Sequence, residues 1–186
     1  GYTAVNLSME VPATAEADSF TTIPIRALTW NGVPAALQGR LTITALEKPD
    51  RFLRPRLWEH PDQFVLSETQ HRAQFPIDPY REENDIHNWT VGKEVFATTY
   101  STDTTDHTHV PFKALPPGAY RIVATATDPS GAPLETEAFV QVTDLSKGEI
   151  AYGQTLAFQS SSGPFEPGER AEVQFGSTTP GTAILY

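Results

Sequence analysis

Apolar and polar residues alternate at every second position along much of this chain, and this period of two is typical of β-strands that bury one face. The alternation appears in seven short segments, at residues 5–11, 23–27, 41–45, 95–100, 110–115, 120–126 and 134–142. Seven such strands predict an all-β fold, a seven-stranded antiparallel sandwich of the fibronectin or immunoglobulin class.

The apolar side of these strands predicts the core of the sandwich. The residues expected to face it include Val5, Leu7, Ile43, Ile122, Ala124, Val140 and Val142. Asn31-Gly32 predicts a tight hairpin turn that pairs the strand at 23–27 with the strand at 41–45. Asp128-Pro129-Ser130-Gly131 predicts the turn of the last hairpin of the sandwich.

A more specific signal precedes the sixth of these strands, where the sequence reads Leu115-Pro116-Pro117-Gly118-Ala119-Tyr120. Pro117 and Gly118 turn the chain, and the Tyr120 hydroxyl can then donate a hydrogen bond back to the backbone of the turn. This arrangement is the tyrosine corner known from Greek-key sandwiches. A plain proline-glycine turn before a strand is the alternative.

Residues 47–93 interrupt the β pattern, and this stretch is far longer than the usual connection between paired strands. It is rich in large aromatic residues, among them Trp58 and Trp89. Because ordering so long a segment requires the burial of apolar area, we expect both tryptophans to be largely buried and to hold the segment onto the sandwich. A short helix is expected from Ser67 to about Gln74.

Two charged clusters lie within the same stretch. They consist of Arg51, Arg54 and Arg56 and of Glu82, Glu83 and Asp85. Because burial removes favourable hydration from charged groups, both clusters are expected to stay exposed. They form the predicted interaction surface for a neighbouring domain or a partner. The alternative is an excursion that only covers one end of the sandwich.

The charge balance excludes several classes of partner. The 186 residues include 23 acidic and 13 basic side chains, which gives a net charge of −10. Such a field repels phosphate backbones, so we expect no nucleic-acid partner. No stretch approaches the roughly 20 apolar residues of a membrane span, so no direct membrane insertion is expected.

The sequence contains no signal for catalysis. It has no cysteine, no Gly-x-Ser-x-Gly elbow and no glycine-rich phosphate loop. Asp106, His107 and His109 suggest a metal, but a zinc site needs three or four convergent ligands, and a solvated strand end is the preferred interpretation. The histidines at 60, 71 and 87 lack metal-ligand spacing. We therefore expect no enzyme activity, no metal and no cofactor.

The pattern also predicts the domain organisation. Residues 1–144 would form the sandwich with its insertion at about 47–93, and residues 145–186 would form a linker and the truncated first strands of a second β-domain. Strand patterns reach both ends of the sequence, so both ends are expected to be boundaries within a longer polypeptide. Many bacterial periplasmic and cell-surface β-domains lack cysteine. We therefore expect a periplasmic or cell-surface, extracellular localisation in a bacterium.

Several of these segments resemble a known family. Residues 115–122, the turn at 128–131 and the strand to Val142 resemble the closing hairpin of a macroglobulin domain. Phe165 to Ala171, with Ala183 to Tyr186, resembles the opening of the next such domain. Three further segments are similar to an insertion in large α2-macroglobulin-like proteins of Bacteroidetes, namely residues 56–62, 75–78 and 82–85.

The resemblance implies a non-catalytic structural and interaction module of a large α2-macroglobulin-like surface protein, whose string of macroglobulin domains inhibits endopeptidases by trapping them. Its partners would be the neighbouring domains of the parent chain and, through the parent, proteases. No thioester can lie in this chain, because it lacks cysteine, and no segment resembles a bait region. The alternative is a module that binds carbohydrate or another surface ligand through exposed Trp30, Trp58 or Trp89.

Overall fold

The structure is a computed structural model, in which most of the chain is described. The described residues are 5–56, 59, 62–103, 107–154, 156–160, 166, 168–170 and 173–177. The chain divides into two compact units. The first comprises Gly1–Glu47 with Thr90–Val142, and the second comprises Lys48–Trp89 with Thr143–Tyr186. The predicted all-β class is confirmed, and each unit is described in turn.

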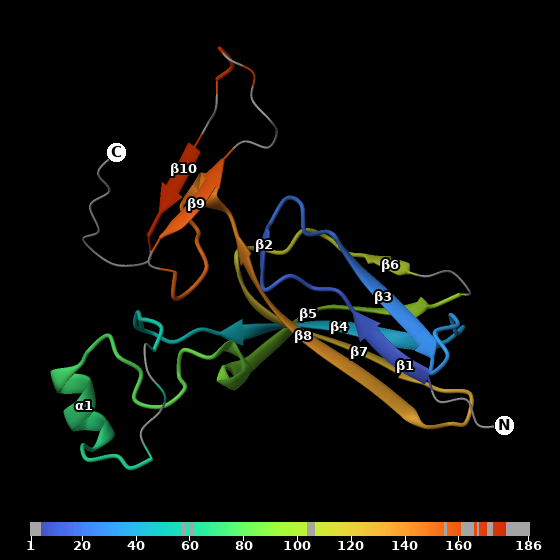
Figure 1. The fold of residues 1–186 in the computed structure, drawn as a ribbon, viewed down its shortest axis with the longest axis horizontal. Coiled ribbons are helices and arrows are strands. Elements are labelled where there is room, and N and C mark those ends of the chain that lie inside the picture. Colours follow the sequence, from blue (N-terminus) through green and yellow to red (C-terminus); the bar gives the residue numbers. More distant parts are fainter. Residues whose placement is uncertain are drawn as a thin grey trace. The chain divides into compact units, whose positions relative to one another are not determined.

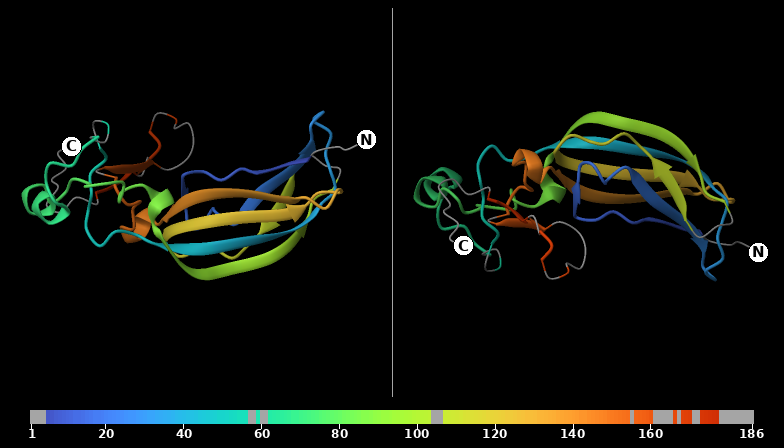
Figure 2. Two further views of the ribbon diagram at one scale, coloured as in Figure 1. Left: turned by 90° about the horizontal axis from the view of Figure 1, so that it is seen from below. Right: turned by 90° about the horizontal axis from the view of Figure 1, so that it is seen from above.

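Two antiparallel sheets form the first unit (Figure 1, Figure 2). Its strands are β1 (Val5–Met9), β2 (Thr14–Glu16), β3 (Thr22–Thr29), β4 (Gln38–Glu47), β5 (Thr90–Ser101), β6 (Thr108–Pro111), β7 (Gly118–Thr127) and β8 (Pro133–Thr143). One sheet has the order β1-β3-β6 and the other the order β2-β8-β7-β4-β5. The seven predicted strands are all present, and β2 is an eighth that three residues are too few to reveal by alternation.

The core lies between the two sheets, and all seven residues predicted to face it are buried. The first sheet contributes Ile23 and Ile25, and the second contributes Leu41, Ile43 and Ile122, each with no exposed surface. These apolar side chains recur at every second residue, so each strand places one face in the core and the other in solvent.

The predicted hairpin between β3 and β4 is wrong, because these strands belong to different sheets. The turn itself is present: Gly32 adopts φ +76°, and the Thr29 amide donates to the Val33 carbonyl oxygen at 2.8 Å. The chain continues beside β3 only briefly, with the Ala35 amide donating to the Ala27 carbonyl oxygen at 2.9 Å. It then crosses to the second sheet. An Asn-Gly pair signals a turn, but it does not specify the partner of the next strand.

Thr102 fixes the crossing between the sheets. Its buried hydroxyl donates to the Ala35 carbonyl oxygen at 2.8 Å and accepts from the Leu37 amide at 2.8 Å. The Thr102 amide also donates to the Leu37 carbonyl oxygen at 2.8 Å. This single side chain therefore satisfies backbone groups of the crossing segment that no ladder serves.

The tyrosine corner predicted at Tyr120 is present. The hydroxyl donates to the Pro116 carbonyl oxygen at 2.7 Å, and the ring is buried in the core cluster. Burial raises the pKa of Tyr120 above the usual value of 10.0, so the hydroxyl stays protonated and remains a donor. The Pro117-Gly118 turn is thereby tied to the first residues of β7.

We predict that Tyr120→Phe lowers the free energy of unfolding by about 1 kcal/mol or more, the usual cost of a lost side-chain hydrogen bond, because the Pro116 carbonyl group loses its donor. Urea unfolding followed by circular dichroism measures the change. An unchanged midpoint would mean that the bond does not stabilise the turn.

Gly39 on β4 is required by close packing rather than by its backbone angles. A Cβ atom there would overlap the Thr125 carbonyl oxygen and the ring of Tyr100, which lies opposite on β5. The Tyr100 hydroxyl occupies this place because it donates to the Thr125 carbonyl oxygen at 3.1 Å. Burial raises the pKa of Tyr100 to about 12, which keeps this donor protonated.

We predict that Gly39→Ala destabilises the first unit by about 1–3 kcal/mol, the usual cost of overpacking a core. Gly118→Ala is the matched control, because its new Cβ would approach nothing closer than 3.5 Å. Thermal unfolding of both variants tests this. Equal melting temperatures for the two would contradict the assignment of Gly39.

The fourth of the seven predicted strands, β5, determines where the long insertion leaves the sandwich. In an immunoglobulin constant domain the fourth strand joins the sheet of the first two strands, whereas here β5 pairs with β4. The register places Glu47 opposite Thr90, at the ends of the two strands. The insertion is therefore residues 48–89, at the tip of a β4–β5 hairpin, and residues 90–93 of the predicted stretch belong to β5.

The second unit contains little regular structure. Its elements are helix α1 (Glu68–Gln74), the 3-10 helices η1 (Ile86–Asn88) and η2 (Leu145–Lys147), and strands β9 (Ala157–Ser160) and β10 (Val173–Gly176). The helix expected from Ser67 is present, with a capping box between Ser67 and Gln70. β9 and β10 form a two-stranded antiparallel sheet. No helix in the described part of the chain is long and apolar enough to cross a membrane.

Candidate functional site

The insertion, residues 48–89, contains the predicted interaction surface and groups with residues 143–186 in the second unit. Residues 51–56, an irregular segment of the insertion, run beside residues 76–81. The Arg54 amide donates to the Ile77 carbonyl oxygen at 2.8 Å. No longer ladder is formed here, so side chains must satisfy most backbone groups of the two segments.

Arg51 and Arg54 join these two segments. The Arg51 Nη1 donates to the Pro76 carbonyl oxygen at 2.7 Å. The Arg54 guanidinium forms a two-pronged pair with Asp78, in which Nη2 donates to Oδ2 at 2.9 Å and Nε contacts Oδ1. The planar guanidinium fork suits this geometry and makes it stronger than a single contact.

Arg56 joins the same segments a little further along. Its Nη2 donates to the Pro79 carbonyl oxygen at 2.8 Å and to the Arg81 carbonyl oxygen at 3.0 Å. The Tyr80 carbonyl oxygen lies at 3.4 Å from the same nitrogen. One guanidinium thus serves three consecutive carbonyl groups of an irregular loop.

The prediction that both charged clusters lie exposed is only partly right. Glu82 and Asp85 are exposed, whereas Glu83 and all three arginines of the first cluster are half-buried. The reason is that irregular backbone leaves carbonyl groups without ladder partners, and arginine carries five donors that can satisfy them. The members of the two clusters that remain available to a partner are therefore the acidic residues Glu82 and Asp85.

Glu83 closes the turn that follows these carbonyl groups. Its two carboxylate oxygens accept from the Tyr80 amide at 3.3 Å and from the Arg81 amide at 2.7 Å. The Arg51 Nη2 lies 3.6 Å from Oε1. Burial acts to raise the pKa of Glu83, but the backbone hydrogen bonds and the Arg51 charge outweigh it and leave the pKa below 4.5.

Asp85 caps η1. Its Oδ1 accepts from the His87 amide at 3.1 Å and lies 2.6 Å from the His87 ring nitrogen Nδ1. The hydrogen bond from the His87 ring is the main cause that lowers the pKa of Asp85. Asp85 and His87 therefore form an exposed pair at the surface of the insertion.

Trp89 ends the insertion and is buried as predicted, with 6% of its surface exposed. Its indole N–H donates to the Glu83 carbonyl oxygen at 3.0 Å, and its ring meets the ring of Tyr152 edge to face at 5.0 Å. The Tyr152 hydroxyl donates to the Arg51 carbonyl oxygen at 2.9 Å. Tyr152 was not predicted as part of the site, because nothing in the sequence relates it to a residue so far along the chain. Trp58 lies outside the described residues.

A second aromatic group surrounds α1. The rings of Phe64 and Tyr80 lie 4.5 Å apart, and the His71 ring lies 5.3 Å from those of both Tyr80 and Phe75. The Tyr80 hydroxyl donates to the Leu66 carbonyl oxygen at 2.8 Å. Phe64 and Phe75 are nevertheless 40% and 45% exposed, and α1 has no buried residue. These rings attach the helix to residue 80 without forming a closed core.

The histidines do not form a metal centre in the described part of the chain. Asp106 lies outside it, the His107 Nε2 lies 3.4 Å from the Glu10 Oε1, and the rings of His107 and His109 are 6.3 Å apart. Among the described residues no group of three or more metal-ligating side chains gathers. His60 also lies outside the described residues.

Trp30 is the more exposed of the two tryptophans that the structure describes. It follows β3 in the turn at Gly32, and 88% of its surface is accessible. Of the three indoles predicted as stacking platforms, Trp30 is therefore open to solvent and Trp89 is buried. No protein-family model matches the chain, and no curated protein matches it.

We predict that Glu83→Gln loosens the insertion, because a neutral amide has one acceptor oxygen where the carboxylate offers two to the Tyr80 and Arg81 amides. Hydrogen exchange at these two amides should accelerate about tenfold, the equivalent of a lost hydrogen bond. Glu82→Gln is the matched control, since Glu82 is an exposed neighbour of the same type.

The same assignment has a pH signature. Because the pKa of Glu83 is lowered on folding, its contribution is present above pH 4.5 and is lost as the pH falls through the folded pKa. Protection of the Tyr80 and Arg81 amides should therefore decline on acidification, and less steeply in Glu83→Gln. Equal slopes for the variant and the parent chain would contradict the role of Glu83.

Proposed function

We propose that this chain is a non-catalytic structural and interaction module of a large α2-macroglobulin-like surface protein, periplasmic or extracellular in a bacterium, whose parent inhibits endopeptidases by trapping them. The support comes from the macroglobulin-like hairpin around Tyr120 and from the insertion at the β4–β5 tip. The observation that supports the proposal most directly is that charged side chains of the insertion form hydrogen bonds with its own backbone. Such use of charge favours a braced spacer over a reactive or cleavable loop.

The contacts within the insertion distinguish two roles for it, a structural scaffold and a bait region that a protease cleaves. A bait region must enter the cleft of an attacking protease in extended form, and residues 51–56 are tied to residues 76–81 by the three arginines. Proteolysis of a folded protein requires local opening of the cleaved segment. The peptide bonds after Arg51 and Arg56 should therefore resist cleavage although trypsin favours arginine.

We predict that trypsin leaves the bonds after Arg51 and Arg56 intact under native conditions and cleaves both rapidly in urea. Mass spectrometry of timed digests measures this. Arg170 provides a matched internal control, because it is exposed in the second unit and should be cut in both conditions. Rapid native cleavage after Arg51 or Arg56, with the protease retained, would identify the insertion as bait and contradict the scaffold function.

The role of the parent is tested on the whole protein that carries this module. A trapped protease is enclosed, so trypsin mixed with the intact protein should still hydrolyse a small chromogenic peptide and should lose activity on a large protein substrate. Loss of both activities, or of neither, would contradict trapping. The isolated module should inhibit neither activity, since it would be scaffold.

The alternative, a carbohydrate-binding module, has weaker support. A stacking platform needs exposed indoles on a shared face, and Trp89 is buried against Tyr152. Trp30 remains as a single exposed indole on a turn. Titration of the chain with soluble glycans, followed by tryptophan fluorescence, would revive the alternative if the emission saturated.

A further inference from the structure

A short segment after η2, residues 149–152, reaches from the β9–β10 sheet to the insertion within the second unit. It lies between two glycines with left-handed backbone angles, Gly148 at φ +76° and Gly153 at φ +79°. The Asp144 amide donates to the Glu149 carbonyl oxygen at 2.7 Å, and the Glu149 amide donates back to the Asp144 carbonyl oxygen at 2.9 Å. These bonds and turns give the segment a defined course.

One side chain of this segment, Tyr152, contacts both ends of the insertion. Its hydroxyl donates to the carbonyl oxygen of Arg51, near the start of the insertion, and its ring meets Trp89, the last residue of the insertion. Arg51 and Trp89 both contact Glu83 in turn, through Nη2 at 3.6 Å from Oε1 and through the indole N–H at 3.0 Å from the carbonyl oxygen. A residue from outside the insertion therefore completes the group that joins its two ends.

The contact of Tyr152 is part of the small core of the second unit. Leu53 of the insertion is only 1% exposed, and Ala151 of the segment is 4% exposed. Burial is the main cause that raises the pKa of Tyr152 above 10.0, although a hydrogen bond with the Leu53 backbone acts in the opposite direction. The hydroxyl therefore stays protonated and remains a donor to the Arg51 carbonyl group.

Ile150, two residues before Tyr152, lies against the β9–β10 sheet. A Cβ atom at Gly176 on β10 would lie 2.8 Å from the Ile150 Cγ2, and the next nearest atoms belong to Ile150 and Leu145. Gly176 is paired with Ala157 on β9, which is buried. Because residues paired across antiparallel strands share a face, the face that carries Gly176 and Ala157 packs on the segment.

We propose that residues 149–152 act as a latch, which couples the order of the insertion to the position of the β9–β10 sheet on Ile150. Ile150 contacts the sheet and Tyr152 contacts the insertion, so a displacement of the sheet withdraws Tyr152 from Arg51 and Trp89. Such coupling is reciprocal, because a free energy shared by two sites acts in both directions. A spacer needs no such coupling, so the latch goes beyond the proposed scaffold function.

Hydrogen exchange of the full chain, resolved by residue with NMR, tests the latch. The reporters are three amides bonded within the insertion: Arg54 to the Ile77 carbonyl oxygen, and Tyr80 and Arg81 to the Glu83 carboxylate. Tyr152→Ala should accelerate exchange at all three by about tenfold or more, because it opens the insertion locally. The amides of β4, which is paired on both sides, should keep their rates.

Tyr152→Phe separates the hydroxyl from the ring. It keeps the contact with Trp89 and loses the bond to the Arg51 carbonyl group, so exchange at the three reporters should accelerate by about threefold to tenfold. If Tyr152→Ala also accelerates exchange in β4, Tyr152→Phe decides by the same criterion. Reporter rates equal to those of the parent chain would overturn the latch. The scaffold function is tested by proteolysis, so the two can fail separately.

Gly176→Ala tests the coupling from the side of the sheet. The three atoms nearest to its new Cβ belong to Ile150 and Leu145 and none to the insertion, yet exchange at the three reporters should accelerate by about threefold or more. In a chain that already carries Tyr152→Ala, Gly176→Ala should add nothing, since both act through the same contact. Additive effects, or no effect of Gly176→Ala alone, would overturn the proposal.

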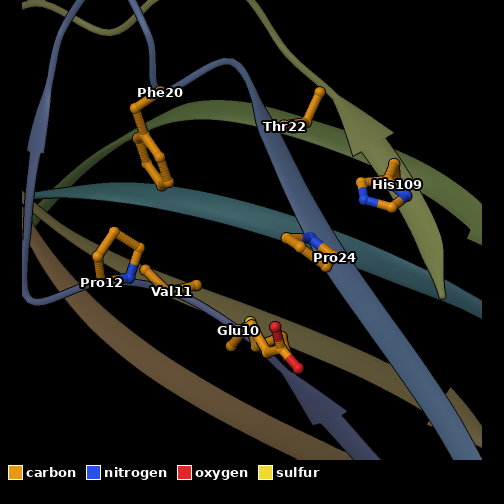
Figure 3. A pocket seen from close by; sticks show the side chains of 8 residues that line it. Glu10, Val11, Pro12, Phe20, Thr22, Pro24 and His109 are labelled. Atoms are coloured by element: carbon orange, nitrogen blue, oxygen red, sulfur yellow. The ribbon is translucent and has the colours of Figure 1, made fainter. Parts of the chain in front are cut away.

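Two variants serve as controls, and both should keep the reporter rates of the parent chain. Phe158→Ala removes a ring that is 61% exposed and lies on the opposite face of the β9–β10 sheet from Ala157 and Gly176. His109→Ala changes an exposed side chain of β6 in the first unit, at the recess shown in Figure 3. Acceleration in Phe158→Ala equal to that in Gly176→Ala, or any acceleration in His109→Ala, would overturn the role of Ile150.

Discussion

The two-sided pairing of β4 is the interaction on which the rest of this structure depends. β4 is hydrogen-bonded to β7 along one edge and to β5 along the other, while Leu41 and Ile43 on its inner face are fully buried. The same strand carries Gly39, whose missing Cβ makes room for Tyr100. It also ends at the insertion, and the pairing of Glu47 with Thr90 holds the two ends of the insertion at the spacing of adjacent strands, about 5 Å. The sandwich thereby meets much of the loop-closure cost of the insertion before any internal contact forms.

Within the insertion, arginine side chains replace the missing ladder. The carbonyl groups of residues 76–81 belong to irregular backbone, and each must find a donor or remain in water. Arg51, Arg54 and Arg56 supply donors from one neighbouring segment, and Glu83 accepts from the amides of the turn that follows. Because these charges are engaged in the fold, the exposed members of the two charged clusters are the acidic residues Glu82 and Asp85. A partner that recognises this surface would have to offer basic or donor groups to Glu82 and Asp85.

Local patterns predicted what local forces determine. Period two located the seven longer strands and their core residues, and the Pro117-Gly118-x-Tyr120 sequence predicted a hydrogen bond that closes within four residues. The errors concern pairing over distance. Asn31-Gly32 indicated its turn correctly, but the choice of β5 and β7 as partners for β4 is made by the whole core. The exposure of the arginines was mispredicted because the carbonyl groups that they contact belong to a loop more than twenty residues further on. Tyr152, which covers Trp89, comes from beyond β8, and no motif connects the two.

Two of the four sheet edges, β6 and β5, are poorly suited to pairing with the backbone of another molecule. β6 is only four residues long and ends in Pro111, which has no amide to offer. β5 is longer, but its register against β4 shifts twice near Glu94, and such bulges with adjacent charges twist an edge away from further pairing. Strand addition is therefore disfavoured at these two edges, although the chain is rich in strands; the other two edges are β1 and β2. Trp30, on the uncharged turn between β3 and β4, lies outside these ladders and is 88% exposed.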